Sequence, residues 1–135
     1  MRIILSILLG GCFIFLLSCS KEKSKTYAEL ILGKWTIVNE IVKEKSSGLS
    51  DTMTYSAQSS LDFSSNGAVV IKVDDDENGT IEPDETQAST YLLENSNLTF
   101  GMSDSTTYII KTLTNSNFSF QSDDDGYEIT INLKR

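Results

Sequence analysis

The chain has 135 residues, contains no histidine and two cysteines, and carries a formal net charge of −8 at pH 7. No basic stripe offsets this acidity, which disfavours nucleic-acid binding. The lack of histidine also removes the usual catalytic base and leaves no zinc ligand set.

The first eighteen residues are typical of a secretion signal. Arg2 precedes an almost unbroken apolar run over residues 3–17, which is shorter than the roughly 20 residues of a spanning helix. The run ends in Leu-Leu-Ser-Cys at Cys19, and this resembles the lipobox of bacterial lipoproteins. The resemblance predicts a signal peptide over 1–18, an acylated Cys19 as mature N-terminus, and a lipidated tether over 19–26.

Two other interpretations of this leader stay open, an uncleaved anchor and a signal peptide cut elsewhere. Cys12 is a second lipobox position, but cleavage there would leave apolar residues exposed. Acylation of Cys19 implies a protein of the cell envelope, held in the outer membrane by its lipid, on the periplasmic or surface face.

Residues 27–135 are predicted to form one all-β domain. Thr26 can cap a short helical turn over 27–32. Apolar residues then alternate in eight runs, which predicts antiparallel strands. In the first run Trp35, Ile37 and Ile41 share one face. The runs cover residues 35–41, 61–63, 69–73, 91–93, 98–102, 108–110, 118–120 and 127–133.

Two connections between these runs are long, residues 45–56 and 74–87. Long loops in a compact domain are usually functional or disordered. The first is rich in serine and threonine and would form a rim or lid if a pocket exists.

The second long connection has the spacing of a calcium-binding loop. Residues 74–85 match the pattern D-x-[DN]-x-[DN]-G-x5-E, with Gly79 at the turn. Calcium prefers six to eight oxygen ligands, which a run of spaced carboxylates supplies. We expect a weak Ca²⁺ site, on a hairpin and not between helices. The alternative is a solvated acidic loop. The predicted ligands are Asp74, Asp76, Asn78, Thr80 through its carbonyl, Glu82 and Glu85.

A family resemblance begins at Gly33-Lys34-Trp35. A short helical turn, then Gly-x-Trp opening the first strand and a meander of strands, resembles the lipocalin-like domains of small bacterial lipoproteins. This resemblance covers residues 30–135 and implies an antiparallel eight-stranded up-and-down barrel with a short N-terminal helical turn. It also implies that Trp35 closes one barrel end, with Lys134 or Arg135 packed over its ring.

The barrel interior is expected to be packed or to hold one small apolar ligand. The candidate lining residues are aromatic side chains and one methionine, which would otherwise be ordinary core: Phe63, Tyr91, Phe100, Met102, Phe118, Phe120 and Tyr127.

No catalytic constellation is present in the sequence, which has no Gly-x-Ser-x-Gly elbow and no glycine-rich phosphate loop. A pair of carboxylates acting as acid and base stays open. We therefore expect a non-enzyme, and a monomer. One hypothesis is a lipid-anchored binding module for a small apolar ligand or another envelope protein. The other is a structural or interaction lipoprotein with a fully packed barrel and no metal.

Overall fold

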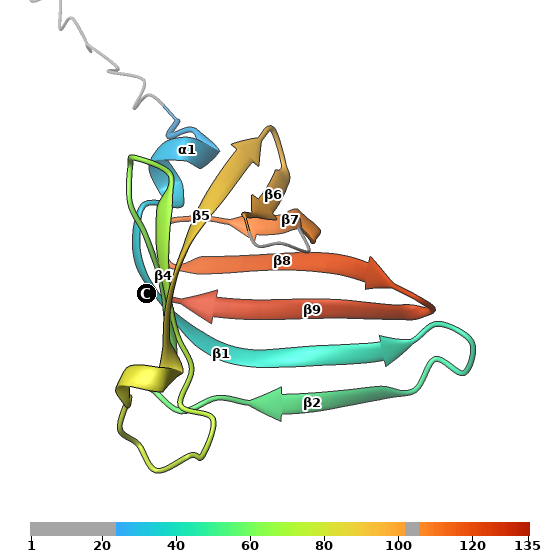
Figure 1. Cartoon of the computed structure of the whole chain (residues 1–135). Helices are drawn as coiled ribbons and strands as arrows, with labels where there is room; N and C mark the ends of the chain where they lie inside the picture. The colour runs from blue at the N-terminus through green and yellow to red at the C-terminus, as the bar shows by residue number, and fades with distance from the viewer. Residues whose placement is uncertain (1–23, 102–105) are drawn as a thin grey trace, which may run out of the picture.

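The structure, a computed structural model, describes residues 24–101 and 106–135 (Figure 1). The predicted signal peptide, Cys19 and Met102 lie outside these residues. In the described part of the chain, no helix has the length and apolar character needed to cross a bilayer. The described elements are α1 (Tyr27–Leu30), β1 (Gly33–Glu44), β2 (Ser50–Thr54), β3 (Ser60–Phe63), β4 (Ala68–Lys72), the 3₁₀ turn η1 (Pro83–Glu85), β5 (Thr86–Glu94), β6 (Asn97–Phe100), β7 (Thr107–Leu113), β8 (Asn117–Asp124) and β9 (Tyr127–Lys134).

Eight of these strands form a closed antiparallel barrel. From β3 to β9 each strand pairs with the next along the chain, and β1 pairs with both β3 and β9. The closing β1–β9 ladder runs from Thr36 and Lys134 to Glu44 and Tyr127. This architecture confirms the predicted eight-stranded up-and-down barrel. Within the described residues, the strands from β1 to β9 close one barrel around one hydrophobic core, so we expect residues 24–135 to fold on their own.

The second strand position of the barrel is split in two. β3 pairs with the first part of β1, and β2 pairs with its second part on the same edge. Residues 55–59 separate the two pieces. The expectation that residues 45–56 form a loop is therefore wrong, because they contain β2. This strand is exposed along its whole length and is held by its ladder with β1, so it carries no alternating apolar pattern.

A β-bulge at Val38 reverses which side chains of β1 face inward. The β1–β9 register shifts between Ile37 and Asn39, and the backbone N–H of Tyr55 donates to the Val38 carbonyl at 3.1 Å. A bulge inserts one unpaired residue, so the alternation changes face beyond it. Glu40, opposite Ile131, therefore points into the barrel. The prediction that Ile41 shares the inner face with Trp35 is wrong for this reason.

One end of the barrel is closed by α1, which is capped by a reciprocal pair of hydrogen bonds between Thr26 and Glu29. Trp35 is fully buried below it and donates its indole N–H to the Ile31 carbonyl at 2.8 Å. The Arg135 guanidinium lies 4.0 Å from the centre of the Trp35 ring and donates to the carbonyls of Leu30 and Leu32. Arg135, not Lys134, is thus the basic residue over the tryptophan.

The opposite end, here called the far end, carries the long connection from β4 to β5. Figure 1 shows this connection, with its 3₁₀ turn, across the barrel from α1. The hairpins after β1 and β8 lie at the same end, since β1, β4 and β8 all run away from α1.

Candidate functional site

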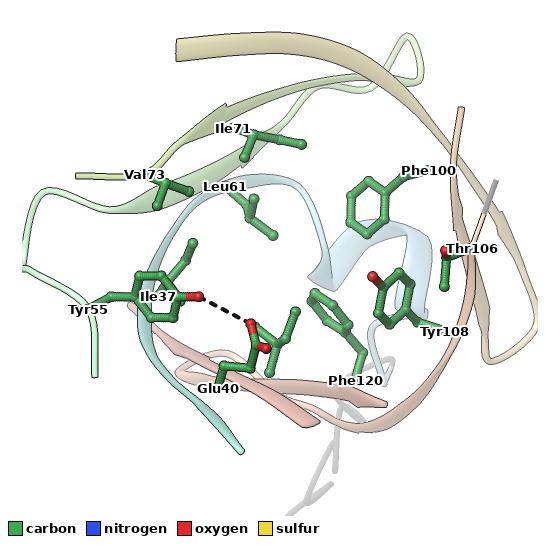
Figure 2. A pocket seen from close by; sticks show the side chains of 11 residues that line it. Ile37, Glu40, Tyr55, Leu61, Ile71, Val73, Phe100, Thr106, Tyr108 and Phe120 are labelled. Carbon is green, nitrogen blue, oxygen red and sulfur yellow. Dashed lines mark hydrogen bonds between the residues drawn. The ribbon is translucent and has the colours of Figure 1, made fainter. Parts of the chain in front are cut away.

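A cavity of about 300 Å³ occupies the barrel interior toward the far end. In Figure 2 the short helix α1 lies behind it. Its wall is mostly apolar and aromatic. The lining residues are Ile37, Glu40, Tyr55, Leu61, Ile71, Val73, Phe100, Thr106, Tyr108, Phe120 and Ile131. This size matches the lower range of small-molecule sites, which are mostly apolar with a few polar groups.

The polar feature of the cavity is a pair formed by Glu40 and Tyr55. The Tyr55 hydroxyl donates to a Glu40 carboxylate oxygen at 3.1 Å, and both side chains point inward (Figure 2). Burial, and then the charge of Glu40, raise the pKa of Tyr55 to about 12. Tyr55 therefore remains a donor at neutral pH. Among the described lining residues, Glu40 is the one charged side chain.

A second tyrosine faces the same carboxylate. Burial raises the pKa of Tyr108, and the charge of Glu40 adds to the effect. The Tyr108 ring packs edge-on against Phe120, with ring centres 5.0 Å apart, and against Phe100 at 5.7 Å. The cavity thus combines one acidic acceptor with an aromatic wall.

Only two of the predicted pocket residues that the structure describes line this cavity, Phe100 and Phe120. Phe63 and Phe118 are fully buried in the core beside Trp35, and Phe118 packs 5.3 Å from the indole ring centre. They belong to the hydrophobic core that forms the floor of the barrel and do not line the cavity.

Tyr91 and Tyr127 are also absent from the lining. The Tyr91 ring packs edge-on against Phe63, and its hydroxyl donates to the Ser64 carbonyl near the α1 end. Tyr127 begins β9 at the far end, and 45% of its surface is exposed. Alternation alone assigned these residues to the inner face, but it does not fix their height along the barrel axis.

The hydrogen-bonded pair of the cavity, Glu40 and Tyr55, was missed in the sequence. Glu40 lies on the outer parity of its run until the bulge at Val38 is taken into account. Tyr55 belongs to the segment that was expected to be a loop. The one sequence feature that could have indicated an inward-facing polar group is the charge of Glu40 within a mostly apolar strand run.

The acidic loop, residues 74–85, folds back on itself through side-chain hydrogen bonds to its backbone. The Gly79 N–H donates to Asp74 at 2.9 Å, with Gly79 at a positive φ of 81° that favours glycine. The two oxygens of Glu85 accept from the N–H groups of Asp75 and Glu82, at 2.9 and 2.7 Å. Pro83 starts the 3₁₀ turn that presents Glu85, so the loop leads directly into β5.

Three of the six predicted calcium ligands converge. Asp74, Asp76 and Glu85 each offer a carboxylate oxygen, and these oxygens lie within 4.8 Å of one another. Calcium binds oxygen at 2.3–2.6 Å, so two oxygens on one ion can lie up to about 5 Å apart. The spacing of these carboxylates fits a shared cation.

Asp74 supplies an independent sign of a missing ligand. Only 2% of the residue is exposed, and its Oδ1 is buried with no hydrogen-bond donor among the described residues. A buried carboxylate is costly unless it is paired or coordinates a metal. Its other oxygen already accepts from Gly79. A buried carboxylate with one unpartnered oxygen, in a cluster with two further carboxylates, is an arrangement that a divalent cation would satisfy.

The other three predicted ligands lie in the same loop but outside the cluster of three carboxylates. The Asn78 amide nitrogen donates to Asp76 and Glu82, at 2.8 and 3.1 Å, and its oxygen accepts from the Thr80 N–H. Asn78 and Thr80 are exposed, whereas Glu82 is half-buried. In this arrangement Asn78 presents its nitrogen to the carboxylates, and its oxygen would face a cation after rotation of the amide.

Hydrogen bonds within the loop shift the pKa values of three acidic groups. The hydrogen bond from the Glu82 backbone lowers the pKa of Glu85 to about 2. The pKa values of Asp75 and Glu82 are raised, chiefly through hydrogen bonding with Glu85. The one ion pair among the described residues joins Lys45 and Asp123, outside this loop. No described basic side chain therefore neutralises the acidic loop.

Comparison with known proteins gives a family and a fold. The family profile described as "Lipocalin-like domain" matches residues 31–120. A lipocalin-like protein from Bacteroides uniformis ATCC 8492, solved at 1.79 Å resolution, is similar with 14% sequence identity and a TM-score of 0.45. That similarity covers 74% of this chain and 94% of the other. No curated protein sequence matches this chain.

Proposed function

This chain belongs to the lipocalin-like family, and from that premise we propose that it is a lipid-anchored binding protein of the bacterial envelope. Its cavity would take one small molecule, and the protein would carry out no chemistry on it. The lipocalin-like barrel supports a binding module, because its strands form a rigid wall around an interior space. Acylated Cys19 would hold this module in the outer membrane.

The cavity is the observation that carries the proposal. A fully packed barrel would favour a structural or interaction protein, whereas a space of about 300 Å³ lined by aromatic and aliphatic side chains favours ligand binding. Glu40 indicates which kind of small molecule the cavity would bind. A carboxylate accepts hydrogen bonds, so the ligand would have an apolar body and a donor or cationic group facing Glu40.

Calcium binding at the acidic loop is a second function that a specific observation supports. The buried carboxylate of Asp74, which has one unpartnered oxygen, lies in a cluster with the carboxylates of Asp76 and Glu85. These three residues would hold the ion, with Asn78, Thr80 and Glu82 completing the oxygen shell. The loop lacks flanking helices, so we expect an affinity near 10⁻⁴–10⁻³ M, about that of extracellular calcium modules.

Fluorescence titration tests the binding function. N-phenylnaphthylamine has an aromatic body, an N–H donor and no charge at pH 7, and its emission rises in apolar surroundings. Added to residues 24–135, it should bind saturably with one molecule per chain. Glu40→Leu removes the acceptor and should weaken binding by at least about tenfold, since a hydrogen bond to a charged group contributes about 1.5–3 kcal/mol.

The matched control is Glu94→Leu, which alters an exposed glutamate at the end of β5 and should leave binding unchanged. Absence of any saturable signal in the folded protein would refute the binding function. Equal loss in both variants would refute the role of Glu40.

A further inference from the structure

We propose that calcium at the acidic loop and the ligand in the cavity bind cooperatively, each raising the affinity for the other. This inference rests on the proposed function and adds its regulation. Two segments of the barrel wall serve both sites, and the buried carboxylate of Asp74 lies where these segments meet.

The first shared segment is formed by Val73 and Asp74, directly after β4. Val73 lines the cavity, and the next residue, Asp74, enters the acidic loop. The Val73 N–H donates to the Glu85 carbonyl at 3.1 Å, so the backbone of one predicted ligand is tied to the cavity wall. A cation that joins Asp74 to Glu85 would brace this wall from both ends of the loop.

The second shared segment is the break between β2 and β3, residues 55–59. Ser59 is fully buried, and its hydroxyl accepts from the Asp74 N–H at 3.0 Å. Its carbonyl accepts from the Ile37 N–H at 2.9 Å, and Ile37 lines the cavity. At the other end of the segment, Tyr55 holds Glu40 in the cavity. Asp74 is therefore linked to the polar pair through a single five-residue segment.

The coupling between the two sites originates in the unpartnered oxygen of Asp74. Without a cation, a buried carboxylate beside two others favours conformations in which Asp74 turns toward water. When the backbone at Asp74 follows this movement, the hydrogen bond from its N–H to the Ser59 hydroxyl breaks and both shared segments loosen. A bound cation compensates the charge and holds the wall in the conformation that forms the cavity. Two ligands that favour the same conformation are coupled, and the coupling is reciprocal.

The test measures the dissociation constant of N-phenylnaphthylamine for residues 24–135 in calcium and in chelator, with magnesium as the control for ionic strength. The probe is neutral, so the charge of the ion does not act on it directly. We expect affinity in calcium to rise at least about fivefold, the lower range of allosteric coupling. Calorimetric titration of calcium with and without the probe should show the same factor.

Two variants locate the coupling. Ser59→Ala keeps every carboxylate but removes the acceptor for the Asp74 N–H, so both ligands should still bind while the coupling factor falls toward one. Ser56→Ala, in the same segment but without a bond to the acidic loop, should retain the full factor.

The outcomes separate the two proposals. Equal probe affinity in calcium and chelator, with calcium shown to bind, overturns the coupling and leaves the binding function intact. Absence of calcium heat overturns the metal site and the coupling, but not the cavity. Absence of probe binding under both conditions overturns the binding function and the coupling together.

Discussion

The substitution Asp74→Asn should stabilise the protein without calcium and lose most or all of this advantage with calcium. In the wild type, Asp74 is buried with one satisfied and one unpartnered carboxylate oxygen. Asparagine keeps an oxygen for the Gly79 N–H and places an amide nitrogen where the unpartnered oxygen was. That nitrogen is a donor, and Asp76 and Glu85 each offer a carboxylate oxygen within 4.8 Å of an oxygen of the native Asp74 side chain.

The magnitudes follow from these contacts. In chelator the variant should be more stable, because an unsatisfied buried group costs about 1–3 kcal/mol. In about 10 mM calcium the wild type gains RT ln(1 + [Ca²⁺]/Kd), which is about 1.4–2.7 kcal/mol for a Kd of 10⁻³–10⁻⁴ M. The variant lacks one calcium ligand, so calcium should stabilise it little. The difference in free energy of unfolding between the variant and the wild type should therefore change by about 1.4–2.7 kcal/mol in favour of the wild type when calcium is added.

Urea unfolding of residues 24–135, followed by the fluorescence of the single tryptophan, measures both effects. Asp84→Asn is the matched control, since it removes the same charge from an exposed position of the same loop outside the carboxylate cluster. It should keep the calcium gain. The reasoning is refuted if Asp74→Asn is less stable than the wild type in chelator, or if calcium stabilises both equally.

Three further predictions concern the rest of the barrel. Arg135→Ala removes the cation over Trp35 and two hydrogen bonds to carbonyls, so the free energy of unfolding in urea should fall by about 1–2 kcal/mol. The control Lys134→Ala should lower it by under about 0.5 kcal/mol. Equal losses in the two variants would contradict the role of Arg135. The raised pKa of Tyr55 means that its contribution to stability is present below pH about 10 and is lost as pH rises through about 12. Absorbance titration should find one phenol ionising near 12 that Tyr55→Phe removes, and an unchanged titration curve would exclude it. The hydrogen bond from the Thr26 backbone lowers the pKa of Glu29, so the stability difference between the wild type and Glu29→Gln should be present above pH about 4.3 and disappear as pH falls through the folded-state pKa. A difference that grows on acidification would contradict this.

The barrel itself was predictable because each of its eight strands has one face against the interior. A strand with one buried face has an apolar residue at every second position. Examples are Leu61 with Phe63 and Phe118 with Phe120, all of which are buried. β2 lacks the pattern because both of its faces are exposed, and it exists only through its ladder with β1.

Prediction of the cavity was less complete because it depends on contacts distant in sequence. The bulge at Val38 has no glycine or proline to mark it, yet it brings Glu40 inside. The height of each aromatic residue along the barrel separates Phe120, which lines the cavity, from Phe118, which fills the floor.

The acidic loop shows the opposite case, in which the relevant residues are close in sequence. The spacing of Asp74, Asp76 and Glu85 is enough to predict that their oxygens can converge. The burial of Asp74 was not predictable in this way, because it depends on Ser59 from another part of the barrel.

Native mass spectrometry of the protein purified from its own host membranes tests the central claim most directly. The binding function predicts a lipidated chain that carries one small organic molecule, released when the barrel is unfolded. A folded, lipidated chain with no such added mass, across preparations in calcium and in chelator, would contradict it.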